Sequence, residues 1–239
     1  MKKLLAVLLL TLPTMAVAVD LDGYYFTAKG GVSKTMDTGT TTLNNLGGQL
    51  RTFENEDLGT GSAFGFSVGK YLTNNFRLEL EAIKRTGYEY DANASPPFTA
   101  VTVESKIQTE AVFINGFYDF QPFSMRNTAI TPYLGGGVGI SKNKMGTGVE
   151  QIDGIPSGNT VDDNTIHQFA YKLSAGTLVS LTEQLSLDVN YQYVNLGAFK
   201  GGTELSSFGV RAPAIDLQRG INGGEIKTQE LMVGLQYKF

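Results

Sequence analysis

The sequence predicts an all-β protein: an eight-stranded antiparallel up-and-down transmembrane β-barrel with four long extracellular loops and three short periplasmic turns. Three observations support this fold class. Eight segments alternate between apolar and polar or small residues with a period of two, which places the apolar residues on one face of a strand. The connections between these segments are alternately long and short, as in barrels of bacterial outer membranes. The last segment, residues 231–239, alternates strictly and ends on an aromatic residue.

The chain begins with the pattern of a secretory signal peptide. Lys2 and Lys3 precede an apolar run over residues 4–12, and a small-x-small site follows at Ala16 and Ala18. We therefore expect residues 1–18 to be removed on export, which leaves residues 19–239 as one outer-membrane barrel domain. The apolar run is too short to span a bilayer as a helix and no other long one follows, so a helical membrane protein is excluded.

The composition narrows the class of protein further. The chain contains 29 Gly, 11 Tyr and 14 Phe but no Cys, which excludes both a disulfide-stapled secreted domain and a lipoprotein anchored on an N-terminal cysteine. The formal net charge is −4 and there is no basic cluster, which argues against nucleic acid as a partner.

The alternating segments account for most of the chain. In order, the predicted strands are residues 23–34, 61–72, 76–90, 101–120, 130–142, 167–180, 185–199 and 231–239. The short connections are residues 73–75, 121–129 and 181–184, and the long ones are residues 35–60, 91–100, 143–165 and 200–224. Soluble sandwiches follow no such rule of alternately long and short connections, which favours the outer-membrane barrel.

The third segment is the most informative of the interior strands. Phe76, Leu78, Leu80 and Ala82 share one face, and Arg77, Glu79, Glu81 and Arg85 share the other. Charges of both signs on an inward face would be very unfavourable in a soluble apolar core. Inside a narrow barrel they can pair, and we expect Arg77 and Arg85 to pair across the lumen with carboxylates on neighbouring strands.

In the fourth predicted strand both faces are rather apolar, and the fifth is rich in glycine. For residues 101–120 we expect the apolar residues Val112, Ile114, Tyr118 and Phe120 to face outward and the polar residues Asn115 and Asp119 to face inward. The following strand has glycines at positions 135, 136, 137 and 139, which would let the wall curve or admit bulky neighbours. A phosphate-binding loop is the alternative, but the spacing does not fit G-x-G-x-x-G and no helix follows.

The last three strands repeat the same pattern. Phe169, Tyr171 and Leu173 are expected to face outward with Lys172 inward, and Asp188 is expected to face inward on the following strand. Residues 231–239 should pair with residues 23–34 to close the barrel, which removes both sheet edges. Their outward aromatics would lie at the periplasmic interface.

The chain resembles the opacity-type surface antigens, including the rickettsial major surface proteins and, more distantly, the barrel domain of outer membrane protein A. The resemblance rests on the segments GYYFTAKGG, SVGKYLTNNFRLELEA, FINGFYDF, TPYLGGGVGIS, FAYKLSAG, LSLDVNYQY and VGLQYKF, which cover the strands and none of the long loops. It implies an eight-stranded barrel in the outer membrane, with frequent roles in adhesion or immune recognition and no common catalytic residues. In the wider class, a terminal strand of this kind is read by the barrel-assembly machinery, which would here recognise Leu235, Tyr237 and Phe239.

The sequence lacks the complete set of residues that catalysis or metal binding requires. His167 with Asp162 and Asp163 upstream could serve a hydrolase or acyltransferase, but no G-x-S-x-G elbow is present. The possible hydroxyl donors are Ser141, Ser157 and Ser174. The acidic groups Glu54, Glu56 and Asp57, or Asp153, Asp162 and Asp163, lack the spacing of a calcium loop. We therefore assign no catalytic, cofactor-binding or metal-binding residue.

The predicted function is that of an outer-membrane surface antigen with a structural or adhesin-like role, since functional residues of barrels sit on the loops. Its partners would be the outer-membrane lipid and a host-surface ligand contacted by the long loops. The alternative is a small porin-like channel lined by Arg77, Glu79, Glu81, Arg85, Asp119, Lys172 and Asp188. Eight strands enclose a space that side chains can fill, which favours a plugged lumen. An outer-membrane hydrolase or acyltransferase is the third choice.

Overall fold

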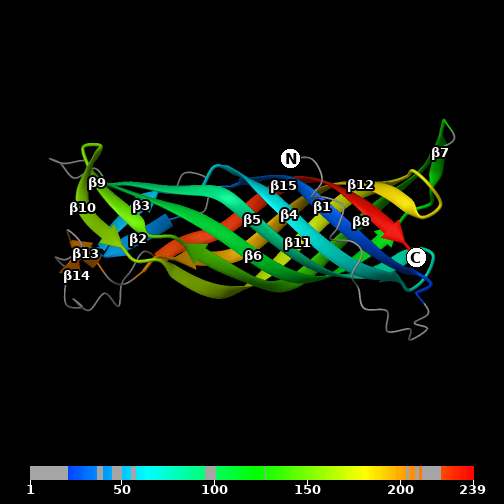
Figure 1. The fold of residues 1–239 in the computed structure, drawn as a ribbon, viewed down its shortest axis with the longest axis horizontal. Helices are drawn as coiled ribbons and strands as arrows, with labels where there is room; N and C mark the ends of the chain where they lie inside the picture. Colours follow the sequence, from blue (N-terminus) through cyan, green and yellow to red (C-terminus); the bar gives the residue numbers. More distant parts are fainter. Residues whose placement is uncertain are drawn as a thin grey trace, which may run out of the picture.

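The computed structural model is a long antiparallel barrel (Figure 1). It describes residues 21–36, 40–44, 50–54, 58–94, 101–126, 128–202, 205–207, 210–211 and 222–239. The expected signal peptide, residues 1–18, lies outside these ranges. Within them, no helix is long and apolar enough to cross a membrane.

Eight long strands form the wall, as predicted. They are β1 (Tyr24–Thr35), β4 (Thr60–Tyr71), β5 (Phe76–Ala94), β6 (Val101–Asp119), β8 (Thr128–Met145), β11 (Asn164–Ser180), β12 (Leu185–Lys200) and β15 (Asn222–Lys238). Each pairs with the next, and β15 returns to β1 in a register that places Ala28 opposite Leu235. The predicted closure of the barrel by the last strand is therefore confirmed.

Short strands lie at the two ends of the barrel (Figure 1). At one end are β2 (Thr40–Asn44), β3 (Leu50–Glu54), β9 (Gly148–Ile152), β10 (Ile155–Val161), β13 (Leu205–Ser207) and β14 (Val210–Arg211). The opposite end carries β7 (Phe123–Met125), which pairs with β8, so the predicted turn over residues 121–129 contains a hairpin. We call these the outer end and the inner end of the barrel.

The period-two pattern is confirmed over the inner half of the wall. The outward residues of β4, β5 and β6 there are apolar and exposed, and Asn115 and Asp119 are buried inside as predicted. This outward apolar surface forms a belt around the barrel, where a lipid bilayer would contact it. The inward glycines of β8 also behave as expected. A Cβ atom at Gly137 would collide with Asn115, and one at Gly135 with the ring of Phe117.

The long connections contain more strand than the sequence predicts. Strand β5 continues to Ala94, four residues into the predicted loop 91–100, and β6 begins at Val101 as predicted. The predicted loop 143–165 contains the β9–β10 hairpin, and β15 begins at Asn222 instead of residue 231. The predicted loops 35–60 and 200–224 contain β2 and β3, and β13 and β14.

The missed extension of the wall strands has a physical cause, which is an inversion of the pattern above the apolar belt. On β6, Glu104 and Lys106 are exposed on the outside, whereas Val103 and Ile107 are buried inside. The same holds on β5, where Glu89 faces outward and Tyr88 inward after a bulge at Gly87. The outer half is therefore a barrel with a polar outer surface and an apolar core. If the outward residues are expected to stay apolar along the whole strand, this half resembles a polar loop.

Candidate functional site

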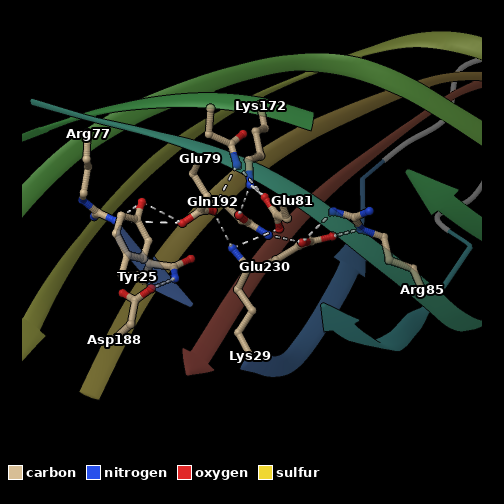
Figure 2. Close-up of polar contacts among 12 residues, drawn as sticks. Tyr25, Lys29, Arg77, Glu79, Glu81, Arg85, Lys172, Asp188, Gln192 and Glu230 are labelled. Carbon is tan, nitrogen blue, oxygen red and sulfur yellow. Dashed lines mark hydrogen bonds and ion pairs between the residues drawn. The ribbon is translucent and has the colours of Figure 1, made fainter. Parts of the chain in front are cut away.

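The inner half of the lumen is filled by a network of buried charges centred on Glu81 (Figure 2). Lys29 on β1 approaches Glu81 with its ammonium nitrogen 3.0 Å from Oε1, and Lys172 on β11 donates to Oε2 from the other side. Asn115 donates a hydrogen bond of 2.8 Å to the same carboxylate. One carboxylate on β5 thus holds together two cations from distant strands, which suits the low dielectric of a closed interior.

A second centre lies further toward the outer end, at Glu230 (Figure 2). Arg85 binds it through two nitrogens, with Nε 2.5 Å from Oε1 and Nη2 3.1 Å from Oε2. Ser33 and Gln192 donate further hydrogen bonds to the same carboxylate. Because β15 is separated from β5 by β4 and β1, this pair reaches across the lumen.

The predicted pairing of both arginines with carboxylates is confirmed, with one correction. Arg77 pairs with Asp119 on the adjacent strand β6, with its Nε 3.1 Å from Oδ1. The partner of Arg85 is not on a neighbouring strand, because a bidentate contact with Glu230 is available to its long side chain. Sequence reasoning missed Glu230 because it began the last strand one residue too late to include it.

Aromatic side chains close the inner end of the lumen. The Arg77 guanidinium lies 4.3 Å from the ring centre of Phe117 and 4.6 Å from that of Tyr133. The hydroxyl of Tyr133 donates a 2.6 Å hydrogen bond to Asp188, so these groups form one packed layer. The space left between Lys29, Lys172 and Asp188 is too narrow to admit a water molecule. The lumen of the described barrel is plugged, as the strand number suggested.

The outer half of the lumen holds an apolar core instead. Its members are Leu58, Ala63, Ile83, Tyr88, Tyr90, Val103, Ile107, Ala111, Phe113, Met145, Ala170, Val194, Leu196, Phe199, Ile226 and Met232. Tyr90 and Phe199 meet edge to face with ring centres 5.5 Å apart. The barrel is thus closed twice, first by ion pairs and then by an apolar core.

Strand β12 contributes to this core by separating from β11 while it stays paired with β15 as far as Lys200. Its pairing with β11 extends outward only to Asn195, and Gly197 then adopts a positive φ of 71°. The carbonyls of Leu196 and Ala198 accept hydrogen bonds from Asn143 on β8, each 2.8 Å long. Since β8 and β12 are not neighbours in the wall, this segment passes behind β11 and brings Phe199 inside.

The candidate catalytic residues are not brought together. His167 faces outward, whereas Ser141 on the adjoining β8 faces inward and donates a 2.6 Å hydrogen bond to the Leu196 carbonyl. Ser174 is also buried inside the barrel, and Ser157 bonds to a backbone carbonyl in the β9–β10 hairpin. The wall of the barrel therefore separates the histidine from Ser141 and Ser174, and Ser157 lies in the hairpin at the outer end.

The acidic residues considered for calcium are dispersed as well. Asp153 occupies the turn between β9 and β10 with a φ of 51°, and Asp163 pairs with Lys144 at 2.9 Å. The hydrogen bond from Lys144 lowers the pKa of the exposed Asp163 carboxyl. The side chains of Glu54, Glu56 and Asp57 lie outside the described residues. The described side chains form no group of three or more His, Asp or Glu that could hold a metal ion.

The residues expected to contact the assembly machinery lie on the outer face of the last strand. Leu235, Tyr237 and Phe239 are exposed, and the two aromatic rings meet edge to face at 5.2 Å. They lie at the inner end of the barrel, beside the start of β1.

Comparison with known proteins agrees with this architecture. Outer membrane protein PagN of Salmonella typhimurium is 26% identical over 206 residues, which cover 76% of this chain and 78% of that protein. A Rickettsia prowazekii protein whose name marks it as a candidate adhesin is 27% identical over 168 residues, covering 66% and 71% of the two chains.

Solved structures show the same fold. Neisserial surface protein A matches with a TM-score of 0.53 at 16% identity, covering 91% of this chain and 98% of that one. The outer membrane protein OprG from Pseudomonas aeruginosa gives a TM-score of 0.51 at 14% identity, covering 91% and 97%. The model of the outer membrane protein beta-barrel domain matches residues 4–239, nearly the whole sequence. With its closed barrel, apolar belt and plugged lumen, the chain belongs to this family of outer-membrane β-barrels.

Proposed function

We propose that the protein is a surface adhesin of the bacterial outer membrane that contacts host ligands through its outer end. The observation that carries this proposal is the second, apolar core above the lipid belt. A barrel that only anchored the protein in the membrane would not need strands that extend beyond the lipid belt into water. Here Tyr88, Tyr90 and Ile107 hold that extension together from the inside. It forms a stiff platform beneath the outer hairpins.

The β9–β10 hairpin is the best-described contact element on this platform. It exposes Ile155, with Ile152 beside it, at a tight turn made by Asp153 and Gly154 in left-handed conformations. Exposed apolar side chains on a rigid hairpin are suited to contact another surface. The names of the rickettsial proteins that this chain resembles support the same assignment. The long connections 35–60, 91–100, 143–165 and 200–224 would supply further contacts.

Transport and catalysis have less support. A channel needs a continuous aqueous path, and the network around Glu81 fills the described lumen. A hydrolase or acyltransferase needs a nucleophile beside a base, and the wall separates His167 from Ser141. We also propose that a signal peptide over residues 1–18 directs export. The barrel-assembly machinery would then recognise Leu235, Tyr237 and Phe239.

The test compares deletions at the two ends of the same barrel. Bacteria displaying a variant in which residues 151–156 of the β9–β10 hairpin are replaced by a two-residue turn should bind host cells less than wild type. The matched control removes the β7 hairpin at the inner end, which should leave binding unchanged. Migration of the unheated protein in gels reports whether each barrel has assembled. If replacement of every outer connection in turn left host-cell binding intact, the adhesin proposal would be wrong.

A further inference from the structure

The outer wall carries a groove at the upper boundary of the apolar belt. On β5, β6 and β8 the outward apolar residues end at Ala82, Val112 and Ile140. The next outward residues on these three strands are Lys84, Glu110 and Lys142. Strand register places Lys84 opposite Glu110 and Glu110 opposite Lys142, so the three charges lie side by side. They form a short charged row where lipid chains would give way to headgroups.

The row and the apolar surface below it line one groove of about 610 Å³. We call it the boundary groove; its lining includes Phe64, Phe66, Val112, Lys84, Glu110 and Lys142. Its aromatic side is strongly exposed, since Phe64 and Phe66 have exposed fractions of 63% and 61%. These side chains are covered by no other part of the described chain, and in a membrane they face lipid.

The two lysines of the row share one carboxylate, which does not use all of their hydrogen-bond donors. The ammonium of Lys84 lies 3.1 Å from one oxygen of Glu110, and that of Lys142 lies 3.5 Å from the other. Both lysine side chains are about half exposed, at 52% and 49%. An ammonium has three donors, and a single shared carboxylate leaves most of them available. The row therefore has one uncompensated positive charge beside the open groove.

We propose that the boundary groove binds a lipid of the outer leaflet that carries a phosphate in its headgroup. Lys84 and Lys142 would bind the phosphate, and the acyl chains would lie on Phe64, Phe66 and Val112. Glu110 lies between the two lysines and neutralises one of their two charges, so it competes with the phosphate for their ammonium groups. The combination of an apolar wall with cations at its upper rim matches such a lipid in both polarity and depth. This inference does not depend on adhesion.

The test uses the full-length barrel reconstituted in phosphatidylcholine bilayers. Electron spin resonance of spin-labelled phosphatidic acid and spin-labelled phosphatidylcholine measures how strongly the protein prefers the phosphate-bearing lipid. The variant K84Q/K142Q should lose the preference, by about fivefold for each lysine, as expected for basic residues near an anionic headgroup. Glu110→Gln removes the carboxylate that competes with the phosphate and leaves both lysines in place. It should therefore raise the preference for phosphatidic acid.

Lys106→Gln is the matched control. Lys106 is an exposed outward lysine on β6, four residues beyond Glu110 toward the outer end, above the headgroup level and outside the groove. Its substitution should leave the lipid preference at the wild-type value. An equal loss in Lys106→Gln and K84Q/K142Q, or an unchanged preference in K84Q/K142Q, would overturn the proposal. Inorganic phosphate in the buffer should not displace the spin-labelled lipid; displacement would show that the groove binds phosphate without its acyl chains.

Discussion

At the scale of single residues, Glu81 is the residue on which the lumen most depends. Two buried ammonium groups, those of Lys29 and Lys172, share its carboxylate, and both come from other strands. Burying a cation is unfavourable unless a counter-charge and hydrogen bonds replace its water. The arrangement is therefore tolerable only while the carboxylate is present, since its removal leaves two like charges close together in a closed space.

We expect Glu81→Gln to lower the free energy of unfolding by about 3–5 kcal/mol, the usual cost of removing one partner from a buried ion pair. Urea titration of the barrel in lipid vesicles measures this change. Lys144→Gln, which breaks an exposed pair with Asp163, serves as the control and should leave the transition almost unchanged, because exposed ion pairs add little to stability. Equal stability of Glu81→Gln and wild type would show that the network does not hold the barrel together.

At the scale of elements, strand β8 shows how the wall makes room for the residues inside it. Gly135, Gly137 and Gly139 alternate along its inward face, and each lies beside a large or polar side chain from β6. Adding a Cβ atom at any of them would force that neighbour to move. The glycines thus leave room for the lumen to be packed with aromatic and amide groups.

Gly137→Ala should therefore destabilise the barrel by about 1–3 kcal/mol, the range typical of overpacking a filled interior. Its Cβ would collide with Asn115, which donates to both Glu79 and Glu81. Gly116→Ala on the paired strand is the control, because its Cβ would meet only ordinary contacts, at 3.8 Å or more, on the outer face. Thermal or urea unfolding of the two variants in the same lipid distinguishes them, and equal loss in both would contradict the packing explanation.

The sequence predicts the inner halves of the wall strands but not their outer halves. The inner half of β5 is predictable because apolar and charged residues alternate there. Leu78 and Leu80 face lipid, and Glu79 and Glu81 face the lumen. Above Lys84 the same strand reverses its pattern, and the bulge at Gly87 shifts its register as well. A period-two rule with one fixed apolar face cannot follow such a reversal.

The site was predictable only in its inner part for related reasons. Arg77 and Asp119 were recognised as inward charges because both lie on clearly alternating segments. Glu230 was not, since the outward face beyond it reads Gln229 and Lys227 and resembles a loop. The inward turn of β12 has one local sign, Gly197, but nothing in the sequence shows that Asn143 on β8 will bind the carbonyls beyond it.

At the scale of the whole molecule, the two closures of the lumen act in series. A solute entering from the inner end meets the layer of Arg77, Phe117 and Tyr133, then the charged network, and then the apolar core that includes Phe199. Each closure uses groups from strands on different sides of the barrel. Opening a path would require the loss of several buried contacts at once, which a small displacement of one loop does not supply.

We therefore expect purified protein in a planar bilayer to show no large steady conductance. A single substitution in the charged layer, such as Arg85→Ala, should leave the bilayer equally silent, because the apolar core around Tyr90 and Phe199 closes the outer half independently. A 16-stranded porin measured in the same bilayers controls for insertion, since barrels of that size enclose an aqueous channel. Steady conductance of the wild-type protein would refute the plugged lumen. Conductance of Arg85→Ala alone would show instead that the ion pairs are the only effective barrier and that the apolar core is permeable.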